Sequence, residues 1–162
     1  MNNRIKSLAI ASMTLTALAA HADDATLGHF QIDRGFATRA NLDTIRQPDG
    51  RVFKISGLFR GYSWTVLAGT RIPRLQVRLM RITLRGKKSA HRAFLSMLNV
   101  ETNQWNRIQQ INLPSDALGF ASIPVFFNAK RYVANGGKIR VRVESDGIGS
   151  AFYDFLKIGV DR

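Results

Sequence analysis

Residues 138–144 read Lys-Ile-Arg-Val-Arg-Val-Glu, and this stretch carries the cleanest structural pattern in the chain. Ile139, Val141 and Val143 alternate with charged side chains, and a period of two places these three apolar residues on one face of a β-strand. The charged side chains then occupy the opposite face. This division is typical of an antiparallel sheet that packs on a core with one face and meets solvent with the other.

Similar short stretches, rich in Val, Ile, Phe and Leu, recur along the chain between turn residues such as Pro48-Asp49-Gly50 and Asn135-Gly136-Gly137. The expected strands are Gly28–Arg34, Arg51–Ser56, Trp64–Ala68, Leu75–Arg85, Arg92–Val100, Gln104–Leu113, Ala121–Phe127, Lys138–Glu144 and Ala151–Val160. Many short strands separated by turns predict an all-β fold, an antiparallel sandwich or a barrel. No linker or charge block divides residues 23–162, so one domain is expected there.

The stretch Leu75–Arg85 changes phase, because Leu75, Val77 and Leu79 share one face and Met80, Ile82 and Leu84 share the other. A phase change inside one strand predicts a β-bulge, here near Met80-Arg81. With that bulge a row of four arginines points away from the core, namely Arg74, Arg78, Arg81 and Arg85.

The first 22 residues predict a secretory signal peptide. Arg4 and Lys6 precede the uncharged apolar run Leu8–Ala19, and Ala20-His21-Ala22 supplies the small residues that a signal peptidase requires. The apolar run is too short to be a stable membrane span, and no membrane-spanning segment is expected after it. The mature chain would begin at Asp23 and work outside the cytoplasm, in the periplasm or beyond the cell.

The mature chain is strongly basic and has no cysteine, so disulfides cannot stabilise it. Residues 23–162 hold 22 Lys and Arg against 11 Asp and Glu, a formal charge of +11. No acidic residue occurs from Arg51 to Val100, whereas a merely solubilising surface mixes both signs. The charge predicts a basic patch that attracts an anionic polymer, such as an acidic polysaccharide or nucleic acid.

The second half of the chain, from about Leu84 to Val160, resembles extracellular jelly-roll β-sandwiches of the galactose-binding-like and carbohydrate-binding-module type. The resemblance rests on the strand-and-turn pattern of residues 84–86 (LRG), 99–105 (NVETNQW), 132–137 (YVANGG), 140–143 (RVRV) and 154–158 (DFLKI). It implies a jelly-roll sandwich and a carbohydrate-binding role. It supports the fold more than the function, since one fold can host many functions.

Two aromatic residues form the preferred ligand platform. Tyr62 and Trp64 share a face if residues 59–64 are extended, and Arg60 and Arg71 flank them. An exposed aromatic face stacks on the C–H-rich face of a sugar ring, although burial of both rings inside the sandwich is an equally weighted alternative. Trp105 follows a tight hairpin and is expected to cover the core rather than to bind a ligand.

Asp154 is the most notable acidic residue, because it falls in phase with the expected inward set Phe152, Leu156, Ile158 and Val160. A carboxylate on the core side must be paired, hydrogen-bonded or bound to a metal. Pairing with an arginine or backbone amides is the favoured interpretation. The resemblance implies the other one, a structural Ca²⁺ held by Asp154 with ligands from among Asp33, Asp43 and Asp49. No other cofactor is expected.

The sequence predicts a non-catalytic protein. His29 and His91 stand apart without metal-ligand spacing, and no motif for a nucleophile, a metalloprotease or a phosphate loop occurs. The leading hypothesis is an exported module that binds a carbohydrate or another anionic surface or matrix polymer, through Tyr62, Trp64 and the arginines. Two alternatives stay open: a structural subunit of a surface or secreted assembly with protein partners, and extracellular nucleic-acid binding through the basic patch.

Overall fold

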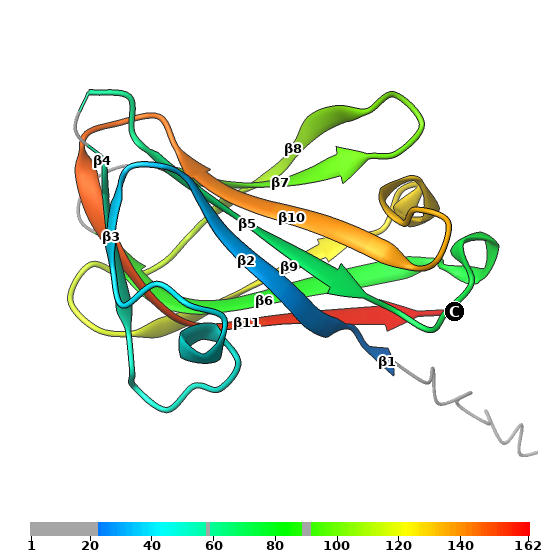
Figure 1. Cartoon of the computed structure of the whole chain (residues 1–162), viewed down its shortest axis with the longest axis horizontal. Helices are drawn as coiled ribbons and strands as arrows, with labels where there is room; N and C mark the ends of the chain where they lie inside the picture. The colour runs from blue at the N-terminus through cyan, green and yellow to red at the C-terminus, as the bar shows by residue number, and fades with distance from the viewer. Residues whose placement is uncertain (1–22, 58, 89–91) are drawn as a thin grey trace, which may run out of the picture.

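The computed structural model describes residues 23–57, 59–88 and 92–162, so the expected leader and His91 lie outside the described residues. Within these ranges the strands form two antiparallel sheets (Figure 1). The first sheet contains β1 (Asp23–Asp24), β3 (Phe36–Thr38), β4 (Phe53–Gly57), β6 (Leu79–Lys88), β9 (Gly119–Val125) and β11 (Gly149–Asp161). The second sheet contains β2 (Thr26–Arg34), β5 (Tyr62–Gly69), β7 (Ala93–Asn99), β8 (Gln104–Ile111) and β10 (Lys138–Ser145).

The chain crosses repeatedly between the sheets, which is what makes the fold a jelly-roll sandwich rather than two separate meanders. The first sheet runs in the order β3-β4-β11-β6-β9, with β1 also pairing with β11, and the second runs β2-β5-β10-β7-β8. Three short 3₁₀ turns complete the described elements: η1 (Asp43–Ile45), η2 (Arg74–Gln76) and η3 (Ala129–Tyr132). The predicted all-β antiparallel sandwich is confirmed.

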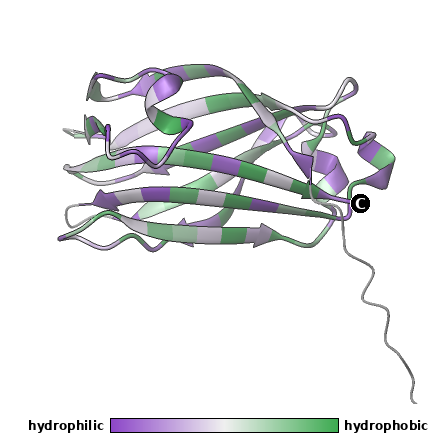
Figure 2. Cartoon of the chain, turned by 90° about the horizontal axis from the view of Figure 1, so that it is seen from below, coloured by the Kyte–Doolittle hydropathy of each residue, from purple (hydrophilic) through white to green (hydrophobic). Residues whose placement is uncertain are grey.

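The stretch 138–144 forms β10, as its alternation predicted, and lies in the middle of the second sheet between β5 and β7. Ile139, Val141 and Val143 are fully buried, whereas Lys138 and Arg140 are exposed. Hydrophilic and hydrophobic residues alternate along strands of both sheets in the same way (Figure 2). Each fully buried Val or Ile contributes roughly 1.5–3 kcal/mol of transfer free energy, so the pattern determines which face of β10 turns inward.

A cluster of aromatic side chains joins the two sheets. Trp64 of β5 is fully buried, with its ring centroid 5.6 Å from that of Phe53 on β4 and 5.2 Å from that of Tyr153 on β11. Both contacts are edge-to-face, a favourable geometry for aromatic pairs. Phe30 of β2 packs on the same cluster. The core of this disulfide-free chain therefore includes an aromatic contact that links its two layers.

The predicted strand Leu75–Arg85 is shorter than expected, and the bulge near Met80-Arg81 is wrong. Residues 74–76 form η2, and β6 begins only at Leu79. From there β6 pairs with β9 without a register shift. The phase change in the sequence reflects the entry from a 3₁₀ turn into a strand, not an extra residue within the strand.

The bulge occurs instead in β11, next to β6. The register between these strands shifts between Tyr153 and Phe155, so Asp154 is the inserted residue. Tyr153 consequently points into the core, and Phe152 lies on the outer face against two lysine side chains. The prediction that Phe152 belongs to the inward set is therefore wrong, because the bulge reverses the phase of β11 before Leu156.

The close approach of two connections explains Gly61. This residue has φ +69°, and a Cβ atom built on it would overlap the carbonyl oxygen of Ser145. Only glycine combines that backbone conformation with such proximity at no steric cost. Gly61 thus allows the β4–β5 connection to lie directly on the end of β10.

No helix within the described part of the chain has both the length and the apolar composition needed to cross a membrane.

Two buried tyrosines make the stability of the sandwich sensitive to alkaline pH. The hydroxyl groups of Tyr62 and Tyr153 lie 2.9 Å apart in the core. Burial raises the pKa of Tyr62 to about 12 and holds that of Tyr153 well above its usual value. Since the tyrosines of the unfolded chain ionise near pH 10, the folded state binds more protons than the unfolded state above that pH. The stability that the neutral buried phenols contribute is complete below pH 10 and is lost as the pH rises toward 12.

We expect the free energy of unfolding to fall by about 1 kcal/mol between pH 9 and pH 11 because of Tyr62 alone. Urea unfolding at several pH values measures this change. The matched control is the double variant Tyr62→Phe/Tyr153→Phe, which keeps both rings but removes both phenols and should show a shallower fall. If the free energy of unfolding falls equally with pH in both proteins, the fall does not come from these two tyrosines.

Candidate functional site

The predicted aromatic platform lies in the core. Tyr62 and Trp64 do share a face of β5, but only 3% and 0% of their surfaces are exposed. They are in phase with Val66 and Ala68, which are also buried, so their common face is the one turned inward. The prediction of a stacking site at these two rings is therefore corrected: a ring packed on all sides presents no face to a sugar.

The predicted arginines do not converge on one surface. Arg60 and Arg71 lie beyond opposite ends of β5, so they cannot flank a common platform. Arg74 belongs to η2, where its guanidinium pairs with Glu101 at 2.6 Å, and Arg78 precedes β6. Arg81 and Arg85 are the members of the row that β6 carries, on the outer face of the first sheet.

Asp154 is fully buried, as its phase suggested, and its nearest partners are nitrogen donors. Its Oδ2 atom lies 3.2 Å from Nη1 of Arg85 and accepts a hydrogen bond from the backbone N–H of Gly50. The same Arg85 nitrogen donates to the carbonyl oxygen of Pro48. Burial raises the pKa of Asp154, although the Arg85 charge and the Gly50 amide act in the opposite direction.

The surroundings of Asp154 do not fit a calcium ion. Calcium requires six to eight oxygen ligands, whereas a guanidinium and an amide N–H occupy one oxygen of this carboxylate. Within the described ranges, no three His, Cys, Asp or Glu side chains gather as a metal site. The other oxygen, Oδ1, is buried without a hydrogen-bond partner. The geometry favours the pairing interpretation, in which Arg85 supplies the positive charge.

A second tryptophan lies where the sequence did not place it. Trp105 of β8 is opposite Leu98 of β7, on the outer face of the second sheet, and is half-buried. The expectation that it covers the core is therefore wrong. The register of β7 and β8 shifts after Arg107, so the orientation of Trp105 cannot be counted along the strand from the buried Ile111.

An arginine stacks on Trp105 and connects it with side chains of three other strands. The guanidinium carbon of Arg142, on β10, lies 3.9 Å from the centroid of the Trp105 ring. Its Nε atom is 3.3 Å from Oδ2 of Asp33, which also accepts a hydrogen bond from Thr65 at 2.6 Å. Four strands thus contribute to one connected group of side chains that fixes the orientation of the ring.

A similar group lies beside the first. The guanidinium carbon of Arg107 is 3.9 Å from the centroid of the Phe94 ring, and its Nε atom is 3.7 Å from Oε1 of Glu144. Ser96 donates a hydrogen bond to the same carboxylate oxygen. We call the surface made by both groups the tryptophan face: Asp33, Thr65, Phe94, Trp105, Arg107, Arg142 and Glu144.

The tryptophan face combines apolar rings with paired charges. Each of its two arginines lies beside a carboxylate, so the surface is polar without a large net charge. Carboxylates accept hydrogen bonds from hydroxyl groups and guanidinium groups donate them. A pocket of about 230 Å³ adjoins the face, lined by Leu98, the register partner of Trp105, and by the cations Lys138 and Arg140 among others. The tryptophan face itself thus offers hydrogen-bond donors and acceptors beside an apolar ring.

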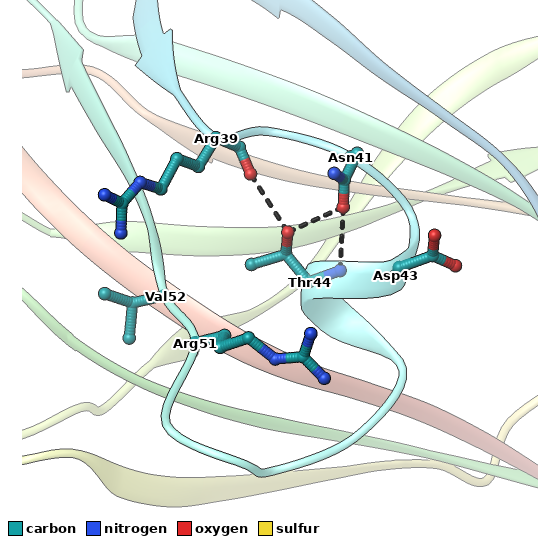
Figure 3. A pocket seen from close by; sticks show the side chains of 6 residues that line it. All are labelled: Arg39, Asn41, Asp43, Thr44, Arg51 and Val52. Carbon is teal, nitrogen blue, oxygen red and sulfur yellow. Dashed lines mark hydrogen bonds between the residues drawn. The ribbon is translucent and has the colours of Figure 1, made fainter.

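A larger pocket, of about 380 Å³, lies in the connection between β3 and β4 (Figure 3). Thr44 is held there by hydrogen bonds to the side chain of Asn41 and the carbonyl oxygen of Arg39. The side chains of Arg39 and Arg51 extend in different directions, and Arg51 is paired with Asp49. Because its charged groups do not converge, this pocket is a weaker candidate than the tryptophan face.

Comparisons with known proteins bear on the fold. A family 35 carbohydrate-binding module from Clostridium thermocellum aligns over 83% of this chain and 96% of its own, with 10% identity and a TM-score of 0.51. The CBM22-1–GH10 modules of xylanase 10B from the same organism, complexed with xylohexaose, align over 81% of this chain and 26% of theirs, with 10% identity and a TM-score of 0.50. This chain has the β-sandwich fold of carbohydrate-binding modules.

A family 61 module in complex with β-1,4-galactotriose aligns over 80% of this chain and 86% of its own, with 14% identity and a TM-score of 0.45. No protein-family model matches the sequence, and no curated protein matches it either. The predicted resemblance to such sandwiches is confirmed for the fold.

The pairing of Arg85 with Asp154 leads to a stability test. Arg85→Leu leaves a buried carboxylate without its guanidinium, and we expect a loss of roughly 3 kcal/mol in the free energy of unfolding. The double variant Arg85→Leu/Asp154→Asn should recover about 1 kcal/mol or more, because it removes the unpaired charge. Denaturant unfolding of both variants and of Asp154→Asn measures the coupling.

The unaltered protein and Asp154→Asn also test for a calcium ion at this carboxylate. We expect the melting temperature of the unaltered protein to be the same in EDTA and in excess Ca²⁺. A rise with Ca²⁺ that disappears in Asp154→Asn would establish a calcium site and overturn the pairing interpretation.

Proposed function

We propose that this protein is a non-catalytic module that binds a polysaccharide through the tryptophan face. The observation that carries the proposal is the half-buried Trp105: Arg142 lies over one face of its ring and is itself paired with the carboxylate of Asp33. The flat apolar part of an indole stacks on the C–H face of a sugar ring, and the nearby carboxylates and guanidinium groups bond its hydroxyls. The likeness to carbohydrate-binding modules is consistent with this role and supports it only through the fold.

The arrangement on strands favours binding of an extended ligand. Trp105, Arg142 and Thr65 lie on β8, β10 and β5 of one sheet, in which β7 separates β8 from β10. Little conformational entropy is then lost when a ligand docks, because the side chains are already ordered by their mutual contacts. A polysaccharide lying across β5, β10, β7 and β8 would meet all of them.

We also propose that the protein acts outside the cytoplasm. Asp23, the first residue of the mature chain expected from cleavage after Ala22, belongs to β1 and pairs with Val160 of β11. Cleavage there would leave both strands of this pair intact.

Glycan binding provides the direct test. Mature protein is passed over immobilised neutral β-1,4-linked polysaccharides (xylan, galactan and mannan), at low and high salt, and its retention is measured. Trp105→Ala should weaken binding to the retained glycan about tenfold or more, since lost stacking costs on the order of 1–2 kcal/mol. The control Phe127→Ala removes an aromatic ring that is 88% exposed and lies outside the tryptophan face. Equal retention of both variants would contradict the proposal.

Expression of the whole chain in a Gram-negative host tests the export. We expect the periplasmic or secreted protein to begin at Asp23, as determined by N-terminal sequencing, and the intact leader to be absent from it. Replacement of Ala20 and Ala22 by bulky residues should leave uncleaved precursor, because a signal peptidase requires small residues there. Cytoplasmic accumulation of unprocessed chain in the unaltered protein would contradict export.

A further inference from the structure

The outer face of the first sheet carries a different kind of surface. In the register of the sheet, Phe152 of β11 lies between Lys54 of β4 and Lys87 of β6. The two ammonium nitrogens are 5.9 Å and 5.2 Å from the centroid of the Phe152 ring. Directly beside this row, Phe155 packs edge-to-face on Phe120, and the guanidinium of Arg85 lies 5.6 Å from the Phe120 centroid. We call these six residues the lysine face.

The charges of the lysine face are not neutralised as those of the tryptophan face are. Among the residues that the structure describes, neither Lys54 nor Lys87 forms an ion pair, nor does the exposed Arg81 further along β6. Arg85 is paired, but with a carboxylate that is buried beneath the face. Two like charges held beside one ring repel each other, and a bound anion between them would relieve that repulsion.

We propose that the lysine face is a second binding site, for an anionic polysaccharide whose carboxylate or sulfate groups bind Lys54 and Lys87. Phe152 positions both ammonium groups by cation–π attraction, which limits their motion before the ligand arrives. The sugar rings of the polymer would lie over the partly exposed side chains of Phe152 and Phe155 and the exposed ring of Phe120. The two sites occupy opposite sheets, so one molecule could link a neutral glycan to an acidic one.

The arrangement of the rings favours a polysaccharide over a single-stranded nucleic acid. Bases bind to such surfaces by stacking on free aromatic faces. Here cations lie over Phe152 and Phe120, and Phe155 contacts Phe120 at an interplanar angle of 79°. Phe120 is 60% exposed, but its edge-to-face contact with Phe155 leaves no row of parallel rings on which successive bases could stack. An acidic sugar requires positive charges beside a small apolar surface, and the lysine face supplies both.

The test uses mature protein, purified and checked by its circular dichroism spectrum, and three probes: polygalacturonate, dextran sulfate and a single-stranded oligo-dT. Lys54→Gln/Lys87→Gln should weaken binding to polygalacturonate, dextran sulfate or both about tenfold, and should flatten the dependence of log K on log salt. The control Arg71→Gln/Lys130→Gln removes the same charge from exposed positions near η2 and η3, at the other end of the sandwich. It should change affinity less than twofold.

Phe152→Leu tests whether affinity depends on the positions of the lysine charges or only on their presence. It keeps both lysines, so a general electrostatic attraction would be unaffected, whereas loss of ring-held geometry should reduce affinity about threefold. Carboxylate and sulfate specificity are distinguished by the first two probes. Equal losses in the lysine variant and in its charge-matched control would overturn the proposal, as would tighter binding of oligo-dT than of either polysaccharide.

Trp105→Ala distinguishes this proposal from the proposed function. If the two faces act separately, this variant loses neutral glycan and keeps polygalacturonate or dextran sulfate. Loss of all ligands in Trp105→Ala, in a protein that remains folded, would show that one face binds everything and would overturn the second site. Failure of neutral-glycan binding alone would contradict only the role of the tryptophan face.

Discussion

The contact of Trp64 with Phe53 and Tyr153 is the interaction on which the rest of the sandwich depends. It joins β5 of one sheet to β4 and β11 of the other, at a depth that solvent does not reach. The chain has no cysteine, so it must hold two sheets together by packing alone. Each outer face is then free to carry polar and charged residues, because neither has to contribute to the core. The tryptophan face and the lysine face are both consequences of this division.

Most of the fold could be predicted from the period of its strands. Clean alternation located β10 and the core side of its residues, and each expected strand corresponds to a strand of the structure. Two short strands, β1 and β3, escaped prediction because two or three residues are too few to show a period. The errors in β6 and β11 have one cause. A period identifies inward residues only while the backbone is regular, and neither the 3₁₀ turn η2 nor the bulge at Asp154 is visible in the residue types.

The candidate site was harder to predict than the fold. Trp64 shared its phase with Val66 and Ala68, and this signal favoured burial, whereas an aromatic residue next to glycine and arginine favoured exposure. The first signal was decisive, because burial of an indole outweighs local composition. For Trp105 no phase could be read, since β8 changes register beyond Arg107. Its partners Arg142 and Asp33 are distant in sequence, and only strand pairing brings them together.

The position of β11 has a consequence for how the chain acquires its structure. This strand pairs with β4, β1 and β6, so β4 and β6 are not joined into one sheet until residues 149–161 are available. Its pairing with β1 also joins the two ends of the described chain. Such non-local pairing delays completion of the first sheet until those residues are available. Before then the chain lacks a closed sandwich, and a polypeptide without its tertiary structure can be threaded through a narrow channel.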